Sequence, residues 1–225
     1  MSVSPVDFAS LLCSRLCHDL LSPVGALNNG LELLGDENDP EMRTRVFQLL
    51  SESARASANK LKFFRLAFGA AGGFGEQVDA REGKAAIEGL LVDNKRTQFN
   101  WWVEADTLPK AALKVMLNLA LIASEALVCG GTLDVGGEEH DGQLEIVVKI
   151  EGPRIILDPE LRRTLTDGEG PEGVTPRAAA AYLVHTLATQ AGGRVQISEP
   201  TEGVMIFGVA FPPAGSQGIG AIGPQ

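Results

Sequence analysis

The chain is organised around one helical segment, which reads Leu16-Cys17-His18-Asp19-Leu20-Leu21-Ser22-Pro23-Val24-Gly25-Ala26-Leu27. Through and beyond this segment, apolar residues recur in alternating steps of four and three, at positions 13, 17, 20, 24, 27, 31 and 34. This heptad spacing predicts a long helix that packs against other helices. His18 follows a seam position by one residue, about 100° round the helix, so we expect its imidazole on the flank of the seam and exposed to solvent.

The expected neighbours of His18 on this helix are mostly small or basic. One or two turns away on the same side of the helix lie Ser14, Arg15, Leu21, Ser22 and Gly25. They leave the imidazole unshielded, and Arg15 is suited to attract an anion. Pro23 removes the amide that would bond to the Asp19 carbonyl, which favours a bend beside the histidine. An exposed histidine can be a solvated side chain and nothing more, but beside such a bend it indicates a site.

The combination His18-Asp19-x-x-Ser22-Pro23 resembles the phospho-acceptor box of two-component histidine kinases, which lies on the first helix of a dimeric four-helix bundle. The resemblance implies that His18 accepts a phosphoryl group. Asp19 is then expected to accept a hydrogen bond from Nδ1–H and to fix the tautomer of the ring, with a surface acid as the alternative. Ser22 stands where kinases with phosphatase activity carry a water-positioning Thr or Asn. Bonding to the preceding turn is the alternative for this serine.

Two helices are predicted within residues 1–70. The first begins at Ser4-Pro5 and runs to about Leu34, and the second begins at Asp39-Pro40, because a cap residue followed by proline favours a helix start. The second helix carries two apolar stripes, which a lone hairpin cannot cover. We therefore expect a helical hairpin that dimerises into a four-helix bundle. Small residues at 51–58 are expected opposite the histidine, where they serve helix packing alone or leave room for a docking partner.

Residues 70–75, rich in glycine and alanine, break the helical pattern and are interpreted as a linker. Beyond them, helices are expected near 82–92, from Pro109 to Gly130 and near 175–191. Strands are expected near 99–103, 131–136, 143–150, 194–198 and 204–211. This order predicts an α+β fold, with helices on one face of a sheet, over residues 78–213. The tail at 214–225 is expected to be disordered.

This second part resembles the ATP-binding domain of histidine kinases, of the GHKL type. Residues 115–123 look like its N box, and residues 182–195 look like the helix and strand after its last glycine box. The nucleotide-binding positions depart from the family pattern. Apolar Ile122 or one of its neighbours stands where a second asparagine holds Mg²⁺ in the family. Ile150 replaces the adenine-binding aspartate, and Arg154 replaces a glycine of the same box. In the phosphate loop at 172–177, Pro176 removes an amide donor, and the segment between 157 and 173 is too short for a full ATP lid. The resemblance therefore implies a degenerate domain that does not bind nucleotide.

An intact acceptor box joined to a degenerate ATP site resembles the dimeric histidine phosphotransferases. This resemblance implies a homodimer that takes phosphate from the receiver aspartate of a hybrid kinase onto His18 and passes it to response regulators. Receiver domains of the CckA, CtrA and CpdR type are the implied partners. They would supply the Mg²⁺, so no metal or cofactor is expected in this chain. The residues expected to dock receivers are Ser14, Arg15, Leu21, Ser22, Gly25, Arg55 and Arg154.

Two alternatives remain open at this point. An active histidine kinase with a divergent ATP site would label itself with ATP. A non-catalytic scaffold would dimerise and bind receivers without needing His18.

Composition narrows the partners and the location. The chain has 225 residues and a net charge of −10, which disfavours nucleic acid and anionic membranes as partners. It contains no run of 18 apolar residues and no signal peptide, so we expect a cytoplasmic protein. Cys13, Cys17 and Cys129 show no metal-like spacing to His140 or His185 and are interpreted as reduced core thiols.

Overall fold

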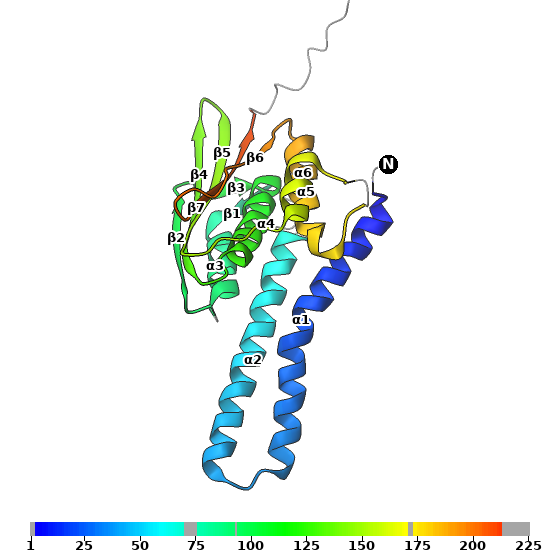
Figure 1. Ribbon diagram of the computed structural model, residues 1–225, viewed down its shortest axis with the longest axis vertical. Coiled ribbons are helices and arrows are strands. Elements are labelled where there is room, and N and C mark those ends of the chain that lie inside the picture. The colour runs from blue at the N-terminus through cyan, green and yellow to red at the C-terminus, as the bar shows by residue number, and fades with distance from the viewer. Residues whose placement is uncertain (1–2, 70–75, 93, 171–172, 213–225) are drawn as a thin grey trace, which may run out of the picture.

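The structure, a computed structural model, consists of a long helical hairpin and an α/β body formed by the elements from β1 to β7 (Figure 1). It describes residues 3–69, 76–92, 94–170 and 173–212. The linker expected at residues 70–75 and the tail expected at residues 214–225 lie outside the described residues. The mixed architecture confirms the α+β fold class that the sequence predicts.

The hairpin helices begin where the sequence predicts. α1 (Pro5–Asp36) is capped by Ser4, whose side chain accepts a hydrogen bond from a backbone amide of the first turn. α2 (Pro40–Ala67) is capped by Asp39 in the same way. Each helix has proline at its first position, where no intrahelical donor is needed. The short connection at residues 37–39 makes the two helices antiparallel neighbours.

The pairing of the two helices differs from the expected one by about a turn. Lys60 Nζ donates to the backbone carbonyl of Asp19 at 2.8 Å, and Gly30 lies against Leu50. His18 therefore lies opposite residue 60 of α2. The expectation that it lies opposite the small residues 51–58 is wrong. The cause is the turn between the helices, whose centre falls beyond residue 37 because α2 begins only at residue 40.

The heptad seam of α1 is divided between two sides of the hairpin. Leu20, Leu27 and Leu34 are half-buried beside α2, whereas Val24 and Leu31 are exposed. Exposed apolar side chains continue along α2. We define the apolar stripe as Val24 and Leu31 of α1 together with Met42 and Leu49 of α2, each pair seven residues apart and so on one face of its helix. Within the described part of the chain, every side chain of this stripe remains at least 41% exposed.

The three cysteines are exposed, so the expected placement in the core is wrong. Cys13 and Cys17 are exposed on α1, and Cys129 lies in the turn after α4 (Lys110–Ala126). A seam position is buried only where a partner covers it, and a single hairpin covers only one side of the seam.

The α/β body is built on a five-stranded sheet with the strand order β2-β4-β5-β7-β6. Its strands are β2 (Thr97–Val103), β4 (Gly131–His140), β5 (Gln143–Glu151), β6 (Val195–Ile197) and β7 (Val204–Phe211). β2 and β4 are parallel, and the other neighbours are antiparallel. A separate sheet pairs β1 (Gln77–Asp79) with β3 (Thr107–Pro109). The helices of the body are α3 (Ala80–Leu91), α4, α5 (Pro159–Asp167), the short 3₁₀ helix η1 (Pro176–Ala178) and α6 (Ala179–Gln190).

Helices cover one face of the five-stranded sheet, so side chains along each strand alternate between buried and exposed positions. In β5, Ile146 and Val148 are buried, whereas Val147 between them is exposed. α4, α5 and α6 gather on one side of the sheet in Figure 1. The opposite face carries exposed side chains, among them Trp102, which is 67% exposed. The body is therefore a two-layer arrangement with one open sheet face.

Three elements of the body, β1, β3 and α5, are absent from the sequence-based prediction. β1 and β3 span three residues each, which is too short for a periodic pattern. α5 does carry a signal, since Asp158-Pro159 repeats the cap-and-proline start of α1 and α2. The Asp158 side chain accepts a hydrogen bond from the Glu160 amide at 2.9 Å. The segment between β5 and α6 is therefore partly helical, where a shortened lid was expected.

The end of α2 belongs to the core of the body. Phe63, Phe64, Leu66 and Ala67 are buried and join one apolar cluster with the helices and the sheet of the body. In α4, Asn118 Nδ2 donates to the Ala67 carbonyl at 3.2 Å. The hairpin and the body are thus separated near residue 70 in the order of the sequence, but they share one apolar core.

Candidate functional site

His18 lies on the flank of α1, with its side chain 84% exposed. Its Nδ1 is 3.1 Å from Oδ1 of Asp19, the next residue along the helix. When Nδ1 carries the proton, it donates to this carboxylate, and Nε2 keeps its lone pair. The ring then presents a nucleophilic nitrogen to solvent from a helix.

Asp19 is held in turn by Arg15, one helical turn earlier. Arg15 Nε donates to Asp19 Oδ2 at 2.8 Å, so the two oxygens of the carboxylate serve different partners. The side chain of Asp19 is 16% exposed, and that of Arg15 is 8% exposed. The expectation that Arg15 is exposed is wrong, because the body packs against this part of α1.

The α/β body supplies the remaining partners of Arg15. Nη2 forms an ion pair with Glu125 at the end of α4, and Nη1 donates to the carbonyl oxygen of Arg177 in η1 at 3.3 Å. Burial by itself lowers the pKa of Arg15, but the carboxylates of Glu125 and Asp19 outweigh this effect and raise that pKa. Burial raises the pKa of the Glu125 carboxyl, and Arg15 acts against the rise. A charged guanidinium thus links α1 to the body beside His18.

Lys60 completes the surroundings of Asp19 from the side of α2. Pro23 has no backbone N–H, so the Asp19 carbonyl lacks the donor that a regular α-helix supplies four residues later. Lys60 Nζ donates to this carbonyl at 2.8 Å. The backbone group that the proline leaves open is therefore satisfied from the other helix.

We expect Lys60→Met to lower the free energy of unfolding by about 1 kcal/mol, because the Asp19 carbonyl loses its donor. In a Pro23→Ala background the same change is expected to cost less, since the new amide at position 23 can bond this carbonyl. Urea unfolding of the single and double variants measures the coupling. Lys62 is exposed two residues further on, and Lys62→Met serves as the control with little expected change. An equal cost of Lys60→Met in both backgrounds would contradict the role given to this lysine.

The other residues expected at the site are divided among three elements. On α1 lie Ser14, Leu21, Ser22 and Gly25, the first three of them exposed. Arg55 is exposed on α2, closer to the hairpin tip than Lys60 by about 7.5 Å along the axis. Arg154 is exposed in the loop after β5, and this loop is hydrogen-bonded to the end of α4 at 2.9 Å. The α1 group shares a helix with His18, whereas the two arginines belong to neighbouring elements.

Lys60, Glu125 and Arg177 are site residues that sequence reasoning missed. Pro23 is a signal for the first of them, because a carbonyl without its helical donor requires a donor from elsewhere. Glu125 and Arg177 carry no local signal, since they lie 110 and 162 residues from Arg15 in the chain.

The positions that correspond to the nucleotide site of the kinases make contacts within the protein. Asn118 is fully buried, and its Nδ2 donates to two backbone carbonyls at 2.8 and 3.2 Å. Ile150 is fully buried in the sheet. Arg177, in the segment that was compared with the phosphate loop of the kinases, pairs with Asp158 at 2.8 Å. Glu172 of that segment lies outside the described residues.

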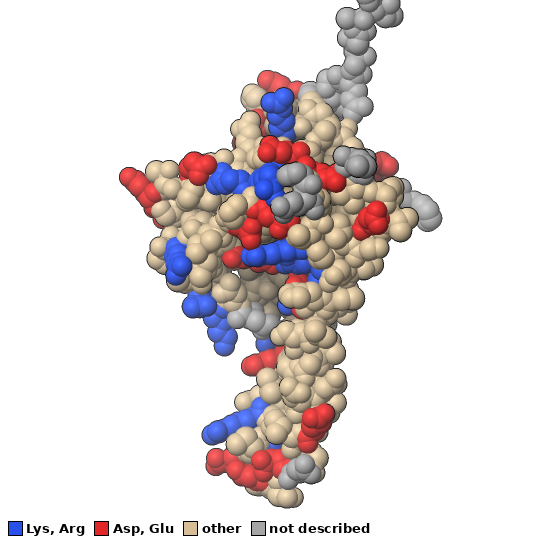
Figure 2. Space-filling model, turned by 45° about the vertical axis from the view of Figure 1, so that its right-hand side comes forward, with Lys and Arg blue, Asp and Glu red and all other residues tan. Residues whose placement is uncertain are grey.

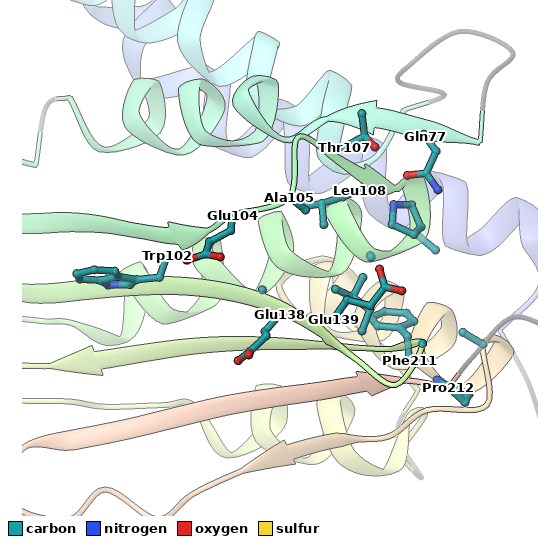
Figure 3. A pocket seen from close by; sticks show the side chains of 17 residues that line it. Gln77, Trp102, Glu104, Ala105, Thr107, Leu108, Glu138, Glu139, Phe211 and Pro212 are labelled. Carbon is teal, nitrogen blue, oxygen red and sulfur yellow. The ribbon is translucent and has the colours of Figure 1, made fainter.

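An open cavity of about 1250 Å³ lies elsewhere in the α/β body (Figure 3). It is lined by the β1–β3 sheet, the start of α4, the ends of β2, β4 and β7, and the connection between β4 and β5. Figure 3 shows Trp102 and the carboxylates of Glu104, Glu138 and Glu139 around it. Among the described residues, those that line it include none from α1 or α2. The cavity is therefore separate from His18.

The fold is a helical hairpin joined to an α/β body, and the hairpin presents an exposed histidine that is hydrogen-bonded to an aspartate. The chain belongs to the histidine phosphotransferase family. A family model described as histidine phosphotransferase C-terminal domain matches residues 80–203. The protein phosphotransferase ChpT of Brucella abortus (strain 2308) is 33% identical over 205 residues, which cover 91% of this chain and 96% of that protein.

Solved structures extend the comparison to three dimensions. The structure of a bacterial phosphotransferase matches with a TM-score of 0.82 at 32% identity, covering 93% of this chain and 98% of the other. The Acinetobacter baumannii histidine kinase AdeS matches with a TM-score of 0.46 at 14% identity, covering 86% of this chain and 96% of the other. The match to the phosphotransferase spans the hairpin and the body together.

Proposed function

We propose that this chain carries phosphoryl groups in a phosphorelay, accepting them on His18 from one receiver domain and donating them to another. The observation that supports this function most directly is the exposed His18 ring, with Nδ1 engaged by Asp19 and Nε2 left for reaction. Membership of the histidine phosphotransferase family agrees with this chemistry.

The transfer step uses the neutral imidazole as nucleophile. Nε2 of His18 attacks the phosphorus of an aspartyl phosphate, and the P–N bond forms while the P–O bond to the receiver carboxylate breaks. The receiver carboxylate leaves with the electron pair. The proton stays on Nδ1, so the phosphorylated ring is positively charged, and the carboxylate of Asp19 stabilises that charge. The same step in reverse delivers the group to the aspartate of the second receiver.

The proposed partners are receiver domains of the CckA, CtrA and CpdR type, as the family resemblance implies. They would bring the Mg²⁺ that neutralises charge on the phosphoryl oxygens. Proposed contacts with the receiver surround His18 on α1 and comprise Ser14, Leu21, Ser22 and Gly25, with Arg55 and Arg154 as further contacts.

We also propose that the α/β body does not use ATP. Ile122 and its neighbours, and Ile150, place buried apolar side chains where the kinases hold Mg²⁺ and adenine. Asn118 is fully buried with its Nδ2 bonded to two backbone carbonyls, and Pro176 at the first position of η1 has no amide to offer a phosphate. These differences from the kinases support a body that docks receiver domains and positions the residues around His18, without using ATP.

A labelling experiment separates this function from its alternatives. The chain is incubated either with a radiolabelled, phosphorylated receiver domain of the CtrA type or with ATP radiolabelled at the γ-phosphate, and acid-labile label on the chain is counted. Label from the receiver alone is the expected result. Label from ATP would identify an active histidine kinase, and label from neither donor would leave a scaffold that only binds receivers.

We propose further that the chain acts as a homodimer through the apolar stripe. The stripe runs along both hairpin helices, and Figure 2 shows few charged side chains on the hairpin between its tip and the body. An apolar surface of this kind gains free energy when a second apolar surface covers it. A second copy that places its own stripe against the first would bury both and complete a four-helix bundle.

Val24→Glu combined with Leu31→Glu is expected to convert the dimer into a monomer, because each change buries an unpaired charge in the proposed interface. Size-exclusion chromatography with light scattering, at several protein concentrations, measures the mass. Leu33→Glu is the matched control, since Leu33 is also exposed but lies about 200° round the helix from Leu31. A wild-type chain that stays monomeric, or a control that dissociates equally, would rule this interface out.

The proposed location is the cytoplasm, where receiver domains of response regulators act. Within the described residues, none of the helices combines the length and the apolar character needed to cross a membrane.

A further inference from the structure

We propose that Glu125 of the α/β body is a positioning residue for phosphoryl transfer at His18, acting through Arg15 and Asp19. The inference rests on the proposed function, and it assigns to the degenerate body a direct part in the reaction of the hairpin. Four side chains carry it, in the order Glu125, Arg15, Asp19 and His18, each bonded to the next. Glu125 contacts neither the ring nor the phosphoryl group, so its effect passes through the guanidinium.

Glu125 can orient the Nε–H group of Arg15 because of the geometry of the guanidinium. A guanidinium is planar and rigid, so fixing its two terminal nitrogens also fixes the direction of Nε–H. The body fixes both terminal nitrogens: Nη2 pairs with Glu125, and Nη1 donates to the Arg177 carbonyl. Nε–H is thereby directed at Asp19 Oδ2, where the hydrogen bond is 2.8 Å long. The loop that presents the Arg177 carbonyl is itself anchored by the ion pair between Arg177 and Asp158.

Without the body, the contact between Arg15 and Asp19 would be an ordinary pair one turn apart on a helix surface. Such exposed pairs contribute only about 0.3–0.5 kcal/mol, because two flexible side chains must be ordered in water. Here the Arg15 side chain is 8% exposed and that of Asp19 is 16% exposed. The body therefore converts a loose surface contact into a buried, fixed one.

The orientation of Asp19 matters because its two oxygens have different tasks. Asp19 follows His18 directly, so their side chains leave the helix about 100° apart, and the carboxylate must turn toward the ring to reach Nδ1. With Oδ2 held by Arg15, Oδ1 stays 3.1 Å from Nδ1. If the hydrogen bond from Arg15 to Oδ2 is lost, the Asp19 carboxylate is free to rotate away from the ring. The ring would then lose the partner that keeps the proton on Nδ1.

The test compares Glu125→Gln with the wild-type chain by two readouts. Single-turnover transfer from a phosphorylated CtrA-type receiver is expected to slow about tenfold at saturating receiver, the effect of losing one charge-assisted hydrogen bond. The receiver concentration that gives half the maximal rate should stay unchanged. Nitrogen NMR of ¹⁵N-histidine-labelled protein should show His18 shifting from the Nδ1–H tautomer toward a mixture with Nε2–H. A purely structural ion pair would change neither the tautomer nor the saturated rate.

Glu151→Gln is the matched control, since it also removes a carboxylate that pairs with a basic side chain of the body, Lys149 at 3.1 Å. It should leave rate and tautomer unchanged. If Glu125→Gln does not fold, Glu125→Asp keeps the charge but withdraws it by one methylene, and it should show a smaller effect of the same kind. Identical tautomer and saturated rate in Glu125→Gln and Glu151→Gln would overturn the proposal. If the wild-type chain takes no label while the tautomer still responds to Glu125→Gln, the proposed function fails and the positioning contact stands.

Discussion

His18→Ala is expected to abolish phosphoryl transfer from a phosphorylated receiver, lowering the rate by at least about 10³-fold, because the nucleophile itself is removed. Its side chain is 84% exposed, so the free energy of unfolding is expected to change by less than about 0.5 kcal/mol. Binding of the receiver should persist, because the surrounding α1 residues remain in place. Radiolabel transfer measures the rate, and isothermal titration calorimetry with the unphosphorylated receiver measures binding.

His140→Ala supplies a closely matched control for this experiment. The ring of His140 is 83% exposed, and its Nε2 lies 3.4 Å from a carboxylate oxygen of Asp141, again the next residue. His140 thus shares exposure and an adjacent acid with His18, but Asp141 is itself 92% exposed, whereas Asp19 is held by a buried arginine. Transfer should be unchanged in His140→Ala. Retained transfer in His18→Ala, or its loss in the control, would show that the acceptor has been assigned to the wrong histidine.

Phe63→Ala is expected to lower the free energy of unfolding by about 3–5 kcal/mol, the usual cost of truncating a fully buried aromatic side chain. Phe63 is 0% exposed and lies with its neighbour Phe64 in the cluster shared by α2 and the α/β body, with ring centroids 5.6 Å apart. The cavity would open where the hairpin joins the body. Urea unfolding followed by circular dichroism and by tryptophan fluorescence measures the change, since both tryptophans, Trp101 and Trp102, lie in β2 of the body.

Trp102→Ala removes a larger aromatic side chain from the open face of the sheet, where it is 67% exposed, and serves as the control. Its expected cost is below about 1 kcal/mol. Because the hairpin and the body share one core, we expect the two probes to report a single transition in wild type. Separate transitions for helix content and fluorescence, with Phe63→Ala shifting only one of them, would show that the hairpin and the body unfold independently.

The course of the two long helices could be predicted from sequence because their signals are local. Ser4-Pro5 and Asp39-Pro40 act within one turn of each helix start, and the heptad seam places His18 on an exposed flank. The same logic applied to Asp158-Pro159 would have predicted α5. Strands were also expected near 143–150 and 204–211, where the structure has β5 and β7.

The candidate site was predictable only in part. His18 and Asp19 stand next to each other in the chain, so their contact needs nothing beyond one turn of helix. Arg15 was expected to be exposed because the sequence of α1 does not show which side the body covers. The exposure of Cys13 and Cys17 has the same explanation, since a seam residue is buried only where a partner covers it.

Residues close together in the chain thus suffice to place the helix starts, the strand alternation and the acceptor histidine with its acid, because a turn of helix or a pleat involves neighbours only. The pairing of Lys60 with the Asp19 carbonyl joins residues 41 apart, and the pairing of Arg15 with Glu125 joins residues 110 apart. Such contacts depend on how the hairpin and the body pack, and packing is set by the whole apolar core. The surroundings that hold the histidine ring are therefore a product of the folded molecule.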